Sequence, residues 1–223
     1  MIGRLLARFR RPAAPSANAV AGGPSVRWMG LDDPANPFVV EGYDCLAFVR
    51  SMVSTTLDPA IAESFHLQRH ADGANLAGQL PGDAVAADCT LAYRSDGAPP
   101  DGPLFKAEAM EDKWDIYLHG DRIYFCRSWT GTVVHVAEFT VAGDTLAIHR
   151  TWSVGGADPG HATREIDYLV KSHVLGRRVP HPLPDTLAAQ PHLVGLHSFS
   201  LYGRQCCFGT FADTLHDVVL KAR

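Results

Sequence analysis

The chain of 223 residues has no long apolar run and lacks the common short motifs of catalysis. No stretch approaches the roughly 20 apolar residues that a membrane-spanning helix needs. The sequence also has no G-x-S-x-G turn, no P-loop and no G-x-G-x-x-G after a predicted strand. These absences argue against an integral membrane protein, the common nucleotide-binding folds and a hydrolase built on a nucleophile elbow.

Recognisable metal-binding spacing is also missing. The C-terminal histidines show no H-x-x-x-H spacing, and the cysteines contain no C-x-x-C pair. The residues concerned are His173, His181, His192, His197 and His216, and Cys45, Cys89, Cys126, Cys206 and Cys207. An odd number of cysteines without a secretory signal favours reduced thiols in a cytosol. We expect no metal site and no cofactor.

The first 11 residues differ from the rest in charge. They contain four arginines and no acidic residue, so the other 212 residues hold 16 basic and 24 acidic groups. An acidic globular part does not favour nucleic-acid binding. Pro12 stops any helix, and the residues up to Pro24 are typical of a flexible Pro/Ala-rich linker. We therefore divide the chain into residues 1–24, a basic amphipathic segment with its linker, and residues 25–223, a single globular domain.

Within this basic segment, helical spacing places apolar side chains on one side and most arginines on the other. The residues are Ile2, Leu5, Leu6 and Phe9, and Arg4, Arg8, Arg10 and Arg11. The arginines interrupt the apolar stretch that a signal peptide needs, so export by that route is not expected. Three interpretations stay open: a weak anchor for an anionic membrane surface, a docking peptide for an acidic partner, and a disordered tail.

The middle of the chain alternates apolar and polar residues in four runs. These runs are Trp114–Leu118, Ile123–Trp129, Val133–Val141 and Leu146–Trp152, and glycine-containing turns separate them. Alternation with short turns predicts a four-stranded antiparallel meander.

Two Asp-Pro pairs predict helix starts, because aspartate caps free amides and proline suits the first helical position. One helix begins at Asp58-Pro59 and runs to about His70, and the other begins at Asp158-Pro159 and ends at Gly176. The predicted fold class is α+β: a twisted antiparallel sheet, with the four-stranded meander at its centre and both helices packed on one face. For the C-terminal third we predict one or two strands, from Leu193–Leu201 and Cys206–Phe211, and a terminal helix in Thr214–Leu220.

The same triplet of arginine, small hydroxyl residue and tryptophan occurs twice. Arg127-Ser128-Trp129 and Arg150-Thr151-Trp152 end two strands separated by one partner, so they should lie at the same end of the sheet. Alternation places both arginines and both tryptophans on the face marked by the aliphatic residues. Either carboxylates of a covering helix, such as Glu165 or Asp167, neutralise the arginines, or the two arginines bind a phosphate or carboxylate while a tryptophan stacks on the ligand.

The segments Lys113-Trp114-Asp115-Ile116-Tyr117 and Arg127-Ser128-Trp129-Thr130-Gly131 carry a family resemblance. They resemble a small uncharacterised bacterial domain with K-W-x-I-Y and R-S-W-T-G motifs, which is found beside domains that process ADP-ribose. This resemblance implies a nucleotide-like anionic ligand. It adds Lys113 and Trp114 to the candidate ligand-binding residues, and it assigns no catalytic residue.

The sequence favours a cytoplasmic binding or interaction module, because no constellation supplies a nucleophile, a base or a metal. Its partner would be a protein or a small anionic ligand held by Arg127, Trp129, Arg150 and Trp152. One alternative is an enzyme acting on an ADP-ribose or nucleotide-type substrate, with Asp158 or Glu165 as the acid/base group. Another is an adaptor at the inner face of the membrane, which would depend on residues 1–11.

Overall fold

The structure is a computed structural model, and it describes residues 26–221. The predicted basic segment and its linker, residues 1–24, lie outside the described residues. The strands are β1 (Arg27–Met29), β2 (Gly42–Asp44), β3 (Val85–Arg94), β4 (Gly102–Phe105), β5 (Trp114–His119), β6 (Arg122–Arg127), β7 (Val133–Ala142), β8 (Thr145–Ser153), β9 (His181–Pro182) and β10 (Phe208–Thr210). The α-helices are α1 (Leu46–Ser51), α2 (Pro59–His70), α3 (Pro159–Leu169) and α4 (Val194–Tyr202).

A six-stranded sheet forms one half of the molecule, with strand order β3-β8-β7-β6-β5-β4 and antiparallel pairing throughout. Its four central strands, β5 to β8, are consecutive in the chain. The predicted α+β class and the predicted four-stranded meander are therefore confirmed. The edge strands β3 and β4 complete the sheet on either side of this meander.

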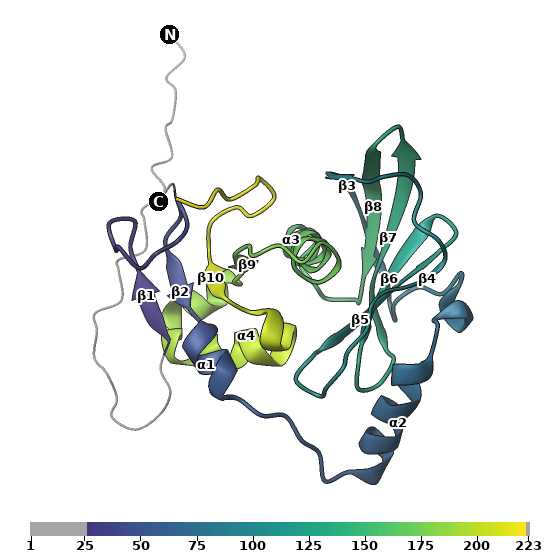
Figure 1. The fold of residues 1–223 in the computed structure, drawn as a ribbon, viewed down its shortest axis with the longest axis horizontal. Coiled ribbons are helices and arrows are strands. Elements are labelled where there is room, and N and C mark those ends of the chain that lie inside the picture. The colour runs from purple at the N-terminus through teal and green to yellow at the C-terminus, as the bar shows by residue number, and fades with distance from the viewer. Residues whose placement is uncertain (1–25, 222–223) are drawn as a thin grey trace.

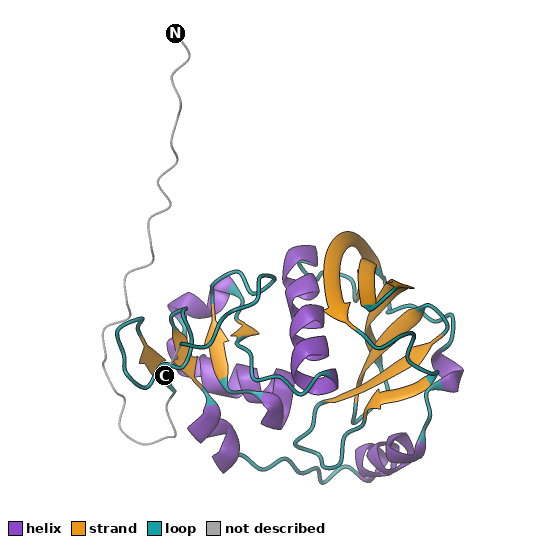
Figure 2. Ribbon diagram, turned by 45° about the horizontal axis from the view of Figure 1, so that its top comes forward, coloured by secondary structure: helices purple, strands orange, loops and turns teal. Residues whose placement is uncertain are grey.

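A second sheet has the order β1-β2-β10-β9 and brings the N-terminal part of the described chain against its C-terminal part. Helix α3 lies between the two sheets (Figures 1 and 2). The largest buried cluster contains side chains from both halves, among them Trp114 and Ile148 from the large sheet and Tyr43 from the small one. The two sheets therefore share one apolar core through α3.

Both predicted Asp-Pro helix starts are present. The Asp58 carboxylate accepts from the backbone N–H of Ala60 at 2.9 Å, and the Asp158 carboxylate accepts from that of His161 at 2.7 Å. After α3 the chain continues through a π-helical turn, Val170–Val174, and then reaches Gly176. Because each aspartate satisfies an amide that has no partner inside the helix, these helix starts could be read from the sequence.

The two helices do not cover the same face of the large sheet. Helix α3 packs on the face of the main core, as predicted. Helix α2 belongs to the opposite side: its Gln68 carbonyl and the Tyr117 hydroxyl both accept hydrogen bonds from Lys106. Tyr117 is part of a second buried cluster, together with Leu76 and Tyr124. The prediction that both helices pack on one face of the sheet is therefore correct for α3 and wrong for α2.

Two predictions in the C-terminal third were wrong. Leu193–Leu201 was predicted as a strand, but most of it forms helix α4. This helix packs against α1 and the core and buries Val194, Ser198, Phe199 and Tyr202, so it lacks a clear polar face. Thr214–Leu220 was predicted as a helix and is irregular, with a single bridge from Leu220 to Phe38. Within the described residues, no helix is long and apolar enough to span a membrane.

Candidate functional site

Arg127, at the end of β6, is held by the fold. Its guanidinium carbon lies 4.9 Å from the ring centre of Trp114, its cross-strand partner on β5. It also donates to the backbone carbonyl oxygens of Ser200 and Leu201, at 2.8 and 3.1 Å. These carbonyls belong to the last turn of α4, where they have no helical partner and carry partial negative charge. Arg127 therefore caps α4, through carbonyl groups and not through the carboxylates expected from the covering helix.

Arg150 and Trp152 lie on the opposite face of the sheet. A β-bulge at His149 gives β8 one residue more than its partner β7 at this point. An extra residue shifts the alternation, so the side chains that follow it change faces. Ile148, before the bulge, belongs to the main core cluster, whereas Trp152, after it, packs against the second cluster with Tyr124.

The predicted pocket between the two arginines is therefore not formed. Arg150 makes an ion pair with Asp88 on β3 at 3.2 Å, and its guanidinium carbon lies 5.8 Å from the ring centre of Trp152. Both charged groups of that pair are largely exposed. Arg127 and Arg150 do not share a face, so they cannot hold one anion as the doubled triplet had suggested.

The other predicted site residues do come together, around Lys113. The ammonium nitrogen lies 4.5 Å from the ring centre of Trp129 and 4.9 Å from that of Phe199. It donates to the hydroxyl of Ser54 at 2.6 Å and to the carbonyl of Met110 at 2.7 Å. Lys113, Trp114, Arg127 and Trp129 therefore form one contiguous group beside α4, at the start of β5 and the end of β6. We call these four residues and Ser54 the Lys113 site.

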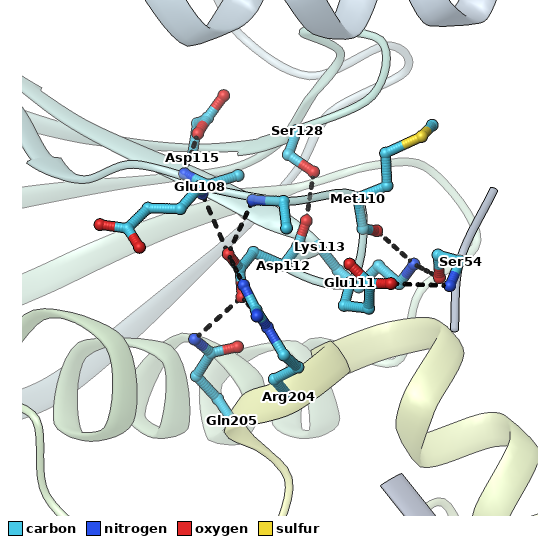
Figure 3. A network of polar contacts seen from close by, with 12 residues as sticks. Ser54, Glu108, Met110, Glu111, Asp112, Lys113, Asp115, Ser128, Arg204 and Gln205 are labelled. Carbon is cyan, nitrogen blue, oxygen red and sulfur yellow. Dashed lines mark hydrogen bonds and ion pairs between the residues drawn. The ribbon is translucent and has the colours of Figure 1, made fainter. Parts of the chain in front are cut away.

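A buried carboxylate organises the loop before β5. Asp112 accepts two hydrogen bonds from the guanidinium of Arg204, at 2.7 and 3.0 Å, and two from the backbone N–H groups of Glu108 and Ala109 (Figure 3). Burial opposes the charge of Asp112, but these bonds outweigh it and lower its pKa. The loop that carries Lys113 is therefore fastened to the segment that follows α4.

Glu165, one of the two predicted acid/base candidates, is enclosed by donors. It accepts from the hydroxyl of Tyr202 at 3.1 Å, and the Nε2 atoms of His135 and His161 lie 3.6 and 3.8 Å from its oxygens. Burial opposes ionisation of Glu165, but His135, His161 and Tyr202 together hold its pKa below the usual value. Glu165 is ionised at neutral pH and is a poor proton donor there. The second candidate, Asp158, caps α3.

A polar groove lies between α3 and the C-terminal segment, along the free edge of β3. Its volume is about 480 Å³. It is lined by Thr90, Leu91, Ala92, Tyr93 and Arg94, by Asp167, Lys171 and Arg177, and by Leu215, His216 and Asp217. We call it the β3 groove.

Two buried charges lie in the wall of the β3 groove. The ammonium of Lys171 lies 2.7 Å from the carboxylate of Asp167 and 3.2 Å from that of Asp217. Asp167 also accepts from the hydroxyl of Tyr93 at 2.8 Å. Burial raises the pKa of Asp167 despite these partners. This network joins α3 to β3 and to the C-terminal segment, so it fixes the shape of the groove.

No family model, curated protein or solved structure matches the chain. The suggested link to ADP-ribose-processing proteins therefore stays a prediction. Within residues 26–221, no group of three or more histidine, cysteine or acidic side chains is arranged to hold a metal ion.

Sequence reasoning found four members of the Lys113 site and missed Ser54. That serine precedes Lys113 by 59 residues and sits in a stretch, Met52–Leu57, with no periodic pattern. The residues of the β3 groove were also missed, apart from Asp167, because they come from three distant segments. No local spacing in the sequence indicates either grouping.

Proposed function

We propose that the protein is a cytoplasmic interaction module that binds an extended, acidic segment of a partner protein in the β3 groove. The observation that carries the proposal is the groove itself, about 480 Å³ in volume and open along an unpaired strand edge. Ligand sites in proteins commonly measure roughly 300 to 1,000 Å³. All five cysteines are free, which supports a reducing compartment.

The free edge of β3 supports an extended ligand. β3 pairs only with β8, and every second residue of an edge strand directs its N–H and C=O away from the sheet. Thr90 to Arg94 line the groove, and no backbone hydrogen bond joins them to another described segment beyond β8. A peptide strand could pair with these groups while the groove walls hold its side chains, as in strand-addition complexes.

The charges around the groove support an acidic ligand. Lys171 is already paired with Asp167 and Asp217. Arg94 makes only an exposed pair with Asp144 at 3.7 Å, the kind of contact that contributes little to stability. Arg177 forms no ion pair with any described residue. The two arginines are therefore free to bind carboxylates of an incoming segment.

The test is a selection of random dodecapeptides on the full-length protein, followed by fluorescence anisotropy with the enriched peptides. We expect the enriched sequences to contain aspartate or glutamate. We also expect Arg177→Glu to weaken binding about tenfold or more, since like charges across an interface are costly. Arg50→Glu is the matched control, because Arg50 is exposed on α1, away from the groove.

Strand pairing is tested separately with the peptide. N-methylation at alternate residues removes the N–H groups that would pair with β3 but keeps the side chains, so it should abolish binding. The proposal fails if no peptide is enriched. It also fails if the enriched peptides bind Arg177→Glu as tightly as the wild type.

A further inference from the structure

Ser54 and Lys113 form a close pair of a hydroxyl and an amine outside the β3 groove. The distance from Ser54 Oγ to Lys113 Nζ is 2.6 Å (Figure 3). Ser54 lies on the extended segment that joins α1 to α2 and is partly exposed, whereas Lys113 is buried. A serine hydroxyl is a weak nucleophile unless a base lies within hydrogen-bonding distance. This pair meets that distance requirement.

The surroundings of Lys113 favour its neutral form. No described carboxylate oxygen lies within 4 Å of its nitrogen, and its two hydrogen-bond partners, the Ser54 hydroxyl and the Met110 carbonyl, carry no charge. The rings of Trp129 and Phe199 favour the charged form through cation–π contacts, but burial outweighs them. Burial, helped by the nearby charge of Arg127, lowers the pKa of Lys113 to about 8, although Glu111 and Asp112 oppose the shift. A lysine with this pKa is partly neutral at physiological pH and can accept a proton.

Neighbouring groups fix the position of both members of the pair. The Met110 carbonyl accepts from Lys113 at 2.7 Å and from the indole N–H of Trp129 at 2.8 Å, so it orients the amine. The carboxylate of Glu111 accepts from the backbone N–H of Ser54 at 3.0 Å. The nucleophile and the base are therefore each held by a third group, the arrangement typical of activated serines.

We propose that Ser54 and Lys113 are a nucleophile and general base that hydrolyse esters with an apolar acyl chain. Ser54 Oγ would form a bond to the ester carbonyl carbon while its proton moves to Lys113 Nζ. The bond from that carbon to the alcohol oxygen would then break, and the ammonium would return the proton to the leaving alcohol. A water molecule, deprotonated by Lys113, would attack the acyl-serine, release the carboxylic acid and regenerate Ser54.

Features around Ser54 favour an apolar acyl group. Val53 and Leu57 on the same segment are 77% and 99% exposed, so they offer an apolar surface beside the nucleophile. The backbone N–H groups of Val53 and Thr55 flank Ser54 and donate to no described acceptor. A carbonyl oxygen that gains negative charge during the attack would need donors of this kind.

The first test uses the wild-type protein and needs no variant. Incubation with a fluorophosphonate probe, followed by digestion and mass spectrometry, should locate a covalent adduct on Ser54. Hydrolysis of p-nitrophenyl butyrate should rise with pH and reach half its maximal rate near the pKa of Lys113, about 8. Absence of an adduct on Ser54, or of hydrolysis above the buffer rate, would overturn the proposal.

Variants separate catalysis from packing. Ser54→Ala should reduce hydrolysis about 100-fold or more, since a nucleophile and its base contribute at least that much. Ser51→Ala is the matched control, because Ser51 is an exposed serine on the neighbouring helix α1. Lys113→Arg keeps the positive charge but cannot accept a proton, so hydrolysis should fall similarly while thermal unfolding confirms the fold. Equal rates in wild type and folded Ser54→Ala would overturn the assignment.

Discussion

Gly203 lies against the backbone of Glu111 so closely that a Cβ on the glycine would stand 1.9 Å from the Glu111 carbonyl oxygen. Gly203 has φ 63° and ψ −138°, a backbone conformation that residues with a side chain rarely adopt. The same Cβ would lie 3.0 Å from the side chain of Lys113. This close approach brings the end of α4 against the loop that carries Lys113.

We predict that Gly203→Ala destabilises the protein by about 3 kcal/mol or more, since backbone strain and a steric clash add together. Gly120→Ala is the matched control: Gly120 also has φ 63°, but an added Cβ there meets nothing within 4 Å. That change should cost only about 1 to 2 kcal/mol. Urea unfolding of both variants measures the difference. Equal losses would show that the contact with Glu111 is not rigid.

The two arginines of the repeated triplet should differ in their effect on stability. Arg127→Met removes two charge-assisted hydrogen bonds to the end of α4, so it should cost about 2 to 3 kcal/mol. Arg150→Met removes an ion pair whose members are 49% and 83% exposed, so it should cost less than about 1 kcal/mol. Thermal or urea unfolding of the two variants compares them. A similar loss for both would contradict the difference in their surroundings.

The parts of the fold that depend on neighbouring residues could be predicted from the sequence. The meander follows from alternation and glycine turns within β5 to β8, and the starts of α2 and α3 follow from Asp58 and Asp158. Both are local effects, because each depends on residues a few positions apart. Lys113 and Trp114 were added to the candidate residues by the family resemblance and not by the strand pattern. The pairing of β5 with β6 places them beside Arg127 and Trp129.

The sequence-based predictions failed where contacts between distant segments of the chain determine the structure. The bulge at His149 leaves no mark in the alternation of β8, yet it moves Arg150 and Trp152 to the other face. Helix α4 packs against α1 and the core, so it lacks the polar stripe that identifies a surface helix. The meeting of Ser54 with Lys113 depends on the path between α1 and α2. No propensity or spacing within either segment contains that information.

Stability should fall as the pH drops below the usual histidine range. Burial lowers the pKa of His181 to about 3, and that of His173 likewise to about 3, whereas unfolded histidine titrates near pH 6.5. Between these values the unfolded chain binds more protons, so acidification favours unfolding. The expected loss is about 1.4 kcal/mol per pH unit for each histidine.

Urea unfolding between about pH 7.5 and about pH 5 tests this dependence. His181→Gln retains a group that can bond to Ser198 but cannot bind the proton, so its stability should vary less with pH. His192→Gln changes an exposed histidine and serves as the control. If His181→Gln keeps the full pH dependence of the wild type, His181 is not the group that destabilises the protein in acid.

The pair of Asp167 and Lys171 should show strong coupling. Both side chains are buried, and their charged atoms lie 2.7 Å apart. Lys171→Met leaves a buried carboxylate whose remaining donor is Tyr93, so it should cost about 3 to 5 kcal/mol. Replacing both residues, with Asp167→Leu and Lys171→Met, removes the two buried charges together and should cost less than Lys171→Met alone. A double-mutant cycle by urea unfolding measures the coupling. If the losses of the two single variants simply add, the pair does not act as a unit, and each charge must be satisfied separately by Tyr93, Asp217 or water.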